Sequence, residues 1–244
     1  LIRKRCRRVI FLRPDHLDCM FPADHWADEV RSPGEISLDA FQAYLPLMSA
    51  PHVLGVDWSD LPCSIDYLTP ADRKIELGPS HVPDAKIKVG IAWSGSPTYV
   101  NDAYRSIPLA KFAPLLQVPG VAFYSLQLQP RKGDQETLQQ SAHVLRDLQD
   151  QQSDFADTAA FVRQLDLVIT VDTAVLHLCG AMTRPVWGLM SRRSDWRWRD
   201  DERDQTSWYP SARLFRQQRL DDWNEVMQRV AVELREFAHR VVSS

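Results

Sequence analysis

One segment constrains the fold of this chain most, because it changes directly from a strand pattern to a helix pattern. Residues 166–171 form an apolar, β-branched run that predicts a buried parallel strand. Asp172 and Thr173 are good helix N-cap residues, and an apolar helical pattern follows over residues 173–182. This arrangement places free backbone N–H groups and the positive end of a helix dipole at the carboxyl edge of a sheet. Ligands bind at that edge in open α/β sheets, so the segment predicts an anion site.

Alternating strand and helix patterns from residue 86 onward predict an α/β fold with a doubly wound parallel sheet. The expected strands cover residues 88–95, 121–126, 144–148, 166–171 and 185–190, with a late edge strand at 214–215. The expected helices cover residues 108–116, 134–142, 154–165, 173–182 and 221–242, the third of them capped by Ser153 or Asp154. Right-handed crossovers then give a Rossmann-like layered sandwich in which residues 166–171 are a central strand.

Residues 1–84 lack the regular strand and helix patterns of the later part, and nine of the 16 prolines fall there. Only a short strand at 9–12 and a helix at 38–48 are expected, so the region reads as an incomplete half-domain or a loop-rich lobe. We therefore divide the chain into a partial N-terminal lobe (1–84), a Rossmann-like lobe (85–220) and a C-terminal helix (221–244). The chain begins with Leu1, without an initiator methionine, and we expect it to be a fragment of a longer protein.

Composition excludes several classes of protein. With 29 basic and 32 acidic residues, the net charge of −3 argues against a general nucleic-acid binder. No apolar stretch is long enough to span a bilayer. The basic N-terminus is followed by only four apolar residues (9–12), too few for a signal peptide, so a cytoplasmic location is expected. The four cysteines lack metal-ligand spacing with the seven histidines, and we expect no metal or other cofactor.

The turn after the first expected strand of the sheet is the second candidate for ligand binding. Ser94 and Gly95 are small, so a ligand can approach the backbone closely there. The guanidinium of Arg105 could bind a phosphate through two parallel hydrogen bonds. The alternative is an ordinary β-turn with an exposed arginine. The sequence lacks the GxGxxG and GxSxG patterns here, which argues against a nicotinamide dehydrogenase and an α/β-hydrolase.

At the 166–182 segment, an acid beside a phosphate needs an explanation. Asp172 is expected to cap the helix or to accept a sugar hydroxyl, while Thr173 and the amides from Ala174 onward face the phosphate. His177 lies one turn on, so it is either a ligand-binding residue or a hydrogen-bonded core histidine.

Three further features fall near the ligand edge. Gln127, at a strand end, and Asp157, at a helix start, could contact a base or a ribose. Residues 192–204 mix aromatic residues with five arginines and five acids, which favours a salt-bridged loop packed on its tryptophans over a nucleic-acid site.

An ordered series of short motifs resembles a known family. The motifs are Val89-Gly-Ile-Ala-Trp-Ser-Gly-Ser-Pro97, Arg105-Ser-Ile-Pro-Leu109, Ser125-Leu-Gln127, Asp154-Phe-Ala-Asp157-Thr-Ala-Ala160, residues 166–177, Arg184-Pro-Val-Trp187, Asp195-Trp-Arg-Trp198 and Ser207-Trp-Tyr-Pro210. Together they resemble the glycosyltransferase-like domain that follows tetratricopeptide repeats in many bacterial proteins. That domain is related to glycosyltransferase family 9, the ADP-heptose:lipopolysaccharide heptosyltransferases. The resemblance covers residues 86–218 well and residues 8–70 partly.

The resemblance implies a GT-B architecture of two Rossmann-like lobes, with a nucleotide-diphosphate sugar held mainly by the C-terminal lobe. It places Arg105, Ser106 and Thr173 near the diphosphate. It further places Asp172 and His177 near the sugar and phosphates, and Gln127 and Asp157 near the nucleoside. The acceptor would be a glycan or a protein, and tetratricopeptide repeats could lie upstream.

The sequence departs from this family at its start. Relatives carry a Gly-Leu-Gly-Asp loop whose acid is the usual candidate general base, and this loop does not occur here. Asp15 and Asp18 are the acids near the first expected strand. Two functions therefore lead: a glycosyltransferase-type domain, or a non-catalytic module that binds sugar nucleotides or partners. A nucleotide-sugar epimerase or another GT-B enzyme fits the motif series less well. From this departure we expect the chain to bind a donor but to transfer sugar poorly.

Overall fold

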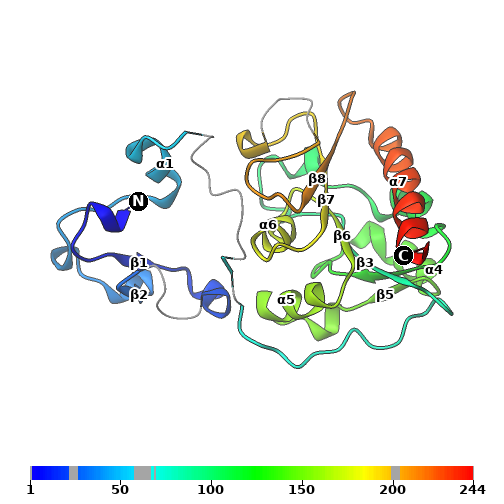
Figure 1. Ribbon diagram of the computed structural model, residues 1–244, viewed down its shortest axis with the longest axis horizontal. Helices are drawn as coiled ribbons and strands as arrows, with labels where there is room; N and C mark the ends of the chain where they lie inside the picture. Colours follow the sequence, from blue (N-terminus) through cyan, green and yellow to red (C-terminus); the bar gives the residue numbers. More distant parts are fainter. Residues whose placement is uncertain (1, 22–26, 58–66, 69, 199–203, 244) are drawn as a thin grey trace.

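The computed structural model describes residues 2–21, 27–57, 67–68, 70–198 and 204–243 (Figure 1). Its main element is a six-stranded sheet. The strands are β3 (Ile87–Ala92), β4 (Val121–Ser125), β5 (Leu145–Asp147), β6 (Leu167–Val171), β7 (Val186–Met190) and β8 (Ala212–Arg216). They are arranged in the order β5-β4-β3-β6-β7-β8, and all five pairings of neighbours are parallel. The predicted α/β fold with a doubly wound parallel sheet is confirmed.

The strand order contains one reversal, and this reversal fixes where a ligand is expected. The chain runs outward from β3 through β4 to β5, returns to β6 beside β3, and then continues outward through β7 to the edge strand β8. Strands β3 and β6 are directly paired, with Val89 opposite Leu167. The loops that follow these two strands therefore leave in opposite directions. In open α/β sheets this topological switch point is the usual ligand position.

Helices cover both faces of the sheet (Figure 1). One face carries α7 (Trp223–Ser243), α3 (Ala113–Leu116) and the 3-10 turn η7 (Leu109–Phe112). The other carries α5 (Phe155–Arg163) and α6 (Ala174–Ala181), whose buried residues form a separate core with the opposite side chains of the strands. The expected helix over 108–116 is thus a 3-10 turn followed by one α-helical turn, with Pro114 at the start of the latter.

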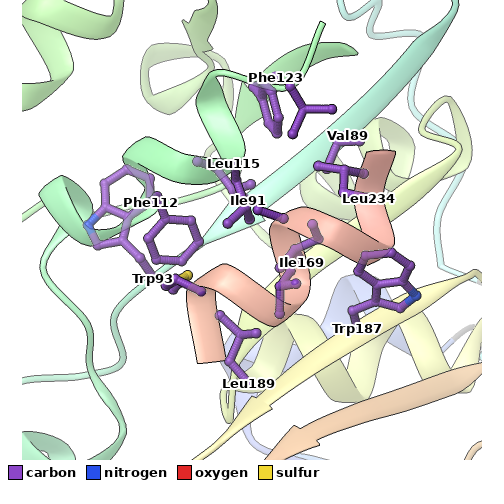
Figure 2. Close-up of a cluster of buried hydrophobic side chains, with 14 of the residues drawn as sticks. Val89, Ile91, Trp93, Phe112, Leu115, Phe123, Ile169, Trp187, Leu189 and Leu234 are labelled. Atoms are coloured by element: carbon purple, nitrogen blue, oxygen red, sulfur yellow. The ribbon is translucent and has the colours of Figure 1, made fainter. Parts of the chain in front are cut away.

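The apolar runs of the sequence form the central strands, and their side chains are buried in the core below α7. Figure 2 shows Val89, Ile91 and Ile169 of the sheet together with Leu234 of α7. Strand β6 is buried at all five positions, as expected for a strand covered on both faces. Complete burial of one such aliphatic side chain contributes about 1.5–3 kcal/mol.

The described part of residues 2–84 contains less regular structure. Strand β1 (Ile10–Leu12) pairs in parallel with β2 (Glu29–Arg31), and one short helix, α1 (Ala50–Leu54), follows. The predicted helix at 38–48 is wrong. Its ends form separate 3-10 turns, η4 (Leu38–Ala40) and η5 (Leu47–Ser49). A proline disfavours helical backbone at the residue before it, which is Leu45 here. Pro46 therefore interrupts a continuous helix just before the second turn.

The chain after the N-terminal part runs along α5 before it enters the sheet. The Arg163 guanidinium donates to the Pro70 carbonyl oxygen at 3.2 Å. The Gln164 side chain both donates to the Ile75 carbonyl oxygen (2.8 Å) and accepts from the Leu77 amide (3.2 Å). Three backbone groups of this irregular segment are thus paired by the side chains of Arg163 and Gln164.

Within the described ranges, no helix combines the length and the apolar character needed to cross a membrane.

Candidate anion-binding site

The turn after β3 is fixed by a side chain from the neighbouring strand. Gln127, just after β4, accepts the backbone N–H groups of Trp93 (3.1 Å) and Ser94 (2.9 Å) through one amide oxygen. Gln127 itself is buried. The Ser94 hydroxyl oxygen is also buried and has no hydrogen-bond partner among the described residues. Gln127 thus holds the turn in place, and Ser94 offers a hydroxyl group that no atom in the described part of the chain uses.

Arg105 links the two loops of the switch point. Its Nη1 donates to the backbone oxygen of Asp172, at the end of β6, at 2.8 Å. Its Nε donates to the Asp102 carboxylate at 3.2 Å, and its guanidinium carbon lies 4.3 Å from the centre of the Tyr99 ring. The side chain is only 20% exposed. The alternative of an ordinary turn with an exposed arginine is therefore wrong.

Because Gly95 has no side chain, the guanidinium group of Arg105 can lie directly against its backbone. A Cβ atom on Gly95 would lie 2.7 Å from the guanidinium carbon of Arg105, well inside van der Waals contact. The Gly95 amide donates to the Ser106 hydroxyl oxygen at 3.0 Å. Gly95, Arg105 and Ser106, which the sequence assigned to one site, are therefore in direct contact.

The N-terminus of α6 supplies the third part of this cluster. Thr173, and not Asp172, is the N-cap residue, so the interpretation of Asp172 as the cap is wrong. The Thr173 side chain makes no capping bond and lies 3.2 Å from the Thr170 hydroxyl instead. Ala174, the first helical residue, is exposed. The Leu176 amide donates to the Thr173 carbonyl oxygen at 3.0 Å. The first two amides of a helix, here those of Ala174 and Val175, have no partner within the helix and remain donors for an anion.

Asp172 is partly buried beside these donors. Burial raises the pKa of its carboxyl group above the usual value, and the charge of Arg105 opposes this shift. A carboxylate with a raised pKa accepts protons and hydrogen bonds more readily than an exposed one. This property is compatible with the predicted contact to a sugar hydroxyl.

His177 is held by aromatic neighbours. Its Nδ1 lies 2.9 Å from the Tyr209 hydroxyl, and its ring stacks on Trp198 with centroids 5.1 Å apart. The Tyr209 ring in turn packs against Gly180, one turn further along α6, where a side chain would overlap it. Burial, together with the charge of Arg197, lowers the pKa of His177 to about 4. These are the contacts of a hydrogen-bonded, partly buried histidine that is neutral at pH 7, and its role in ligand binding stays a prediction.

Asp157 lies at the same sheet edge but in a separate cluster. It accepts the Ser153 amide at 2.8 Å and a hydrogen bond from the Ser153 hydroxyl, and it pairs with Arg73 at 3.6 Å. Partial burial raises its pKa, but the Ser153 hydrogen bonds outweigh this and hold the pKa below its usual value. Asp154 accepts the amides of Ala156 and Asp157, which confirms it as the cap of α5. In the described residues, no hydrogen bond or ion pair joins Asp157 to Arg105.

Three residues that organise the site, Asp102, Arg131 and Asp134, were not assigned from the sequence. Asp102 is 3% exposed and contacts Arg105, Arg131 and Ser106. Asp134, also buried, accepts the indole N–H of Trp93 (2.9 Å) and the Leu109 amide (3.0 Å). Asp102 lies in a polar stretch that reads as a turn, and Asp134 is the first residue of the polar helix expected over 134–142. Only their position between motif residues could have drawn attention to them.

The loop after β7 is described as far as residue 198, and residues 199–203 lie outside the described part. Asp195 pairs with Arg197 at 2.6 Å. Trp198 is buried, and the Trp208 indole N–H donates to the Arg197 carbonyl oxygen at 2.9 Å. The described part fits the predicted salt-bridged loop packed on tryptophans.

Of the two acids near β1, the structure describes one side chain. Asp18 pairs with Arg13 at 2.7 Å and is largely exposed, while the side chain of Asp15 lies outside the described part. Among the described residues, no group of three or more His, Cys, Asp or Glu side chains has the arrangement of a metal site.

Comparison with known proteins gives limited matches. No model of a protein family matches the chain. Protein FlbA of Caulobacter vibrioides is 32% identical over 160 residues, which are 62% of this chain and 25% of FlbA. The chain thus spans about a quarter of the length of this curated relative.

Two solved structures are similar in part. A family 9 glycosyl transferase from Veillonella parvula aligns with 67% of this chain and 48% of its own, at 14% identity and a TM-score of 0.42. The wall teichoic acid polymerase TagF aligns with 66% of this chain and 39% of its own, at 10% identity and a TM-score of 0.36. Both TM-scores are below 0.5.

Proposed function

We propose that residues 85–220 bind a nucleotide-diphosphate sugar, as the donor-binding lobe of a GT-B-type glycosyltransferase. The observation that carries this proposal is the convergence at the switch point of Gly95, Arg105 and the N-terminus of α6. Arg105 joins the loops after β3 and β6 through its bond to the Asp172 backbone oxygen (2.8 Å). The buried Ser94 hydroxyl group adds a further donor. The motif series described from the sequence supports the choice of a sugar nucleotide over other anions.

In such a transfer, an acceptor hydroxyl attacks the anomeric carbon while the bond from that carbon to the diphosphate oxygen breaks. Negative charge then develops on the departing diphosphate. Arg105 and the first-turn amides of α6 would stabilise that charge, as fixed donors do in other group transfers. The acceptor proton passes to a general base. Asp172, whose pKa is raised by burial, lies beside these donors.

A second candidate is a module that binds the sugar nucleotide without turning it over. One observation favours it: the buried carboxylates Asp102, Asp134 and Asp157 already accept hydrogen bonds from protein groups. None of these three is free to take a proton from an acceptor. Incubation with nucleotide sugars, followed by detection of released nucleoside diphosphate, separates the two candidates, because only the enzyme gives turnover that depends on the Arg105 site.

We expect replacement of Arg105 by alanine to weaken binding of a nucleoside diphosphate by about 1.5–3 kcal/mol, the range for a charged hydrogen bond. Isothermal titration calorimetry with ADP, UDP and GDP measures this loss. Arg219→Ala is the matched control, because Arg219 is an exposed cation in the loop after β8. An equal loss in both variants, or none in either, would contradict the assignment of Arg105.

We expect Gly95→Ala to weaken the same binding while leaving stability nearly unchanged. The added methyl group displaces the end of the flexible Arg105 side chain, 2.7 Å away, and not the backbone. The loss should approach that of Arg105→Ala, and the double variant should lose little more than either single variant. Gly133→Ala is the control, because nothing lies within 4 Å of its added carbon. Additive losses would show that Gly95 acts independently of Arg105.

A further inference from the structure

A buried carboxylate, Asp102, holds two cations beside the proposed anion site. One carboxylate oxygen accepts from Arg105 Nε at 3.2 Å, and the other pairs with Arg131. The Asp102 side chain is 4% exposed, whereas that of Arg131 is 43% exposed. The acid is therefore enclosed by its partners, and the second guanidinium keeps a face open to solvent.

Arg131 reaches this position from a third loop of the same edge. Arg131 lies in the loop that follows β4. Strand β4 pairs with β3 on the side opposite to β6. Its backbone N–H donates to the buried Asp134 at 3.3 Å, and Asp134 in turn accepts the indole N–H of Trp93. The loop that carries Arg131 is thus tied to the turn after β3 at a buried point.

The Ser106 hydroxyl connects Arg131 to the Gly95 turn. Its oxygen accepts the Gly95 amide (3.0 Å) and Arg131 Nη2 (3.2 Å), and its proton goes to Asp102 (2.9 Å). The second guanidinium is therefore separated from the Gly95 amide by a single hydroxyl group. Asp102 is thus shared by two guanidinium groups, those of Arg105 and Arg131.

We propose that Arg131 is a second diphosphate-binding residue and that Asp102 is the positioning residue that holds Arg105 and Arg131 as a pair. The proposal rests on the function proposed above and deepens it. Two cations flanking one carboxylate suit a ligand with two adjacent phosphates better than a ligand with one. The pair would thus make the site selective for a diphosphate over a monophosphate.

The first test measures this selectivity by calorimetry with pyrophosphate, ADP and UDP against phosphate, AMP and UMP. Pyrophosphate makes the result independent of the base. Arg131→Gln should weaken binding of the diphosphates about 10- to 100-fold, as expected for a lost charged contact, and weaken monophosphate binding less than about 3-fold. Arg131→Lys should restore part of the affinity, because it keeps the charge but not the fork. Lys132→Gln, at the exposed neighbouring cation, is the control and should change neither.

The second test uses the sign of the effect at Asp102. If this carboxylate only repelled an anion, Asp102→Asn would strengthen diphosphate binding. If it positions the arginines, the same substitution weakens binding about 10-fold or more although a negative charge is removed. Circular dichroism establishes that the variant is folded before titration. Should it not fold, the Arg131 variants decide, because Arg131 is half-exposed and its side chain can be shortened without opening the core.

The outcomes separate this inference from the proposed function. Loss of diphosphate binding in Arg105→Ala with unchanged selectivity in Arg131→Gln would overturn the role of Arg131 and leave the proposed function standing. Stronger binding in Asp102→Asn would overturn the positioning role. A wild-type chain that binds none of the diphosphates would overturn both.

Discussion

Replacing Trp93 by alanine should lower the free energy of unfolding by about 3–5 kcal/mol, as for other large-to-small changes at buried aromatic positions. Trp93 directly follows β3 and is completely buried in the core below α7, where Phe112 also lies (Figure 2). Its indole N–H also donates to Asp134 at 2.9 Å. The substitution therefore leaves a cavity and removes one hydrogen bond from a buried carboxylate. Urea unfolding followed by circular dichroism measures the loss.

Two further variants separate these contributions. Trp93→Phe keeps most of the ring volume but removes the N–H donor, so it should cost about 1–3 kcal/mol, the penalty for an acceptor left short of a partner. Trp196→Ala is the control, because Trp196 is 54% exposed, and it should cost under about 1 kcal/mol. Equal costs for Trp93→Ala and Trp196→Ala would contradict the role of Trp93 in the core.

The sheet could be predicted because its sequence signals are local and consistent. The run at 166–171 is apolar and β-branched, and it ends at residues that favour a helix start, so pattern, propensity and capping agree. The structure has β6 at Leu167–Val171 and α6 at Ala174–Ala181, within two residues of the prediction. The predicted helix at 38–48 failed because it rested on three apolar residues at helical spacing, Leu38, Phe41 and Leu45, and because Pro46 interrupted it.

The site was predicted less completely, because its parts come together only in three dimensions. Gly95, Arg105 and Ser106 were expected at one site, and they are in contact. Asp102 and Arg131 were not expected, because no spacing in the sequence relates two residues 29 positions apart in different loops. Gln127 was expected at the ligand, whereas the structure shows its amide oxygen bound to the backbone of the β3 turn. Its contact with a nucleoside stays a prediction.

His177 should make the stability of this protein depend on pH between about 4 and 6.5. Burial is the main cause that lowers its pKa to about 4 from the ordinary 6.5, with Arg197 adding to the shift and Asp195 opposing it. Between these two values the unfolded chain binds a proton that the folded chain does not. Protonation therefore favours unfolding, and stability falls as pH drops from 6.5 toward 4. Each pH unit costs about 1.4 kcal/mol, so the total approaches about 3 kcal/mol.

The substitution His177→Gln tests this dependence, because glutamine removes the titrating group and keeps a partner for the Tyr209 hydroxyl. At pH 7 the wild-type chain should be the more stable, since the stacking of His177 on Trp198 is lost in the variant. As pH falls to 4, the difference in unfolding free energy should shift by about 3 kcal/mol in favour of the variant. Carboxyl groups that titrate over the same range are shared by both chains, so they cancel in this difference. His143→Gln, at an exposed position, should run parallel to the wild type. Urea midpoints at pH 7, 6, 5 and 4 give the comparison, and parallel curves for His177→Gln would mean that the buried imidazole is protonated as readily as one in the unfolded chain.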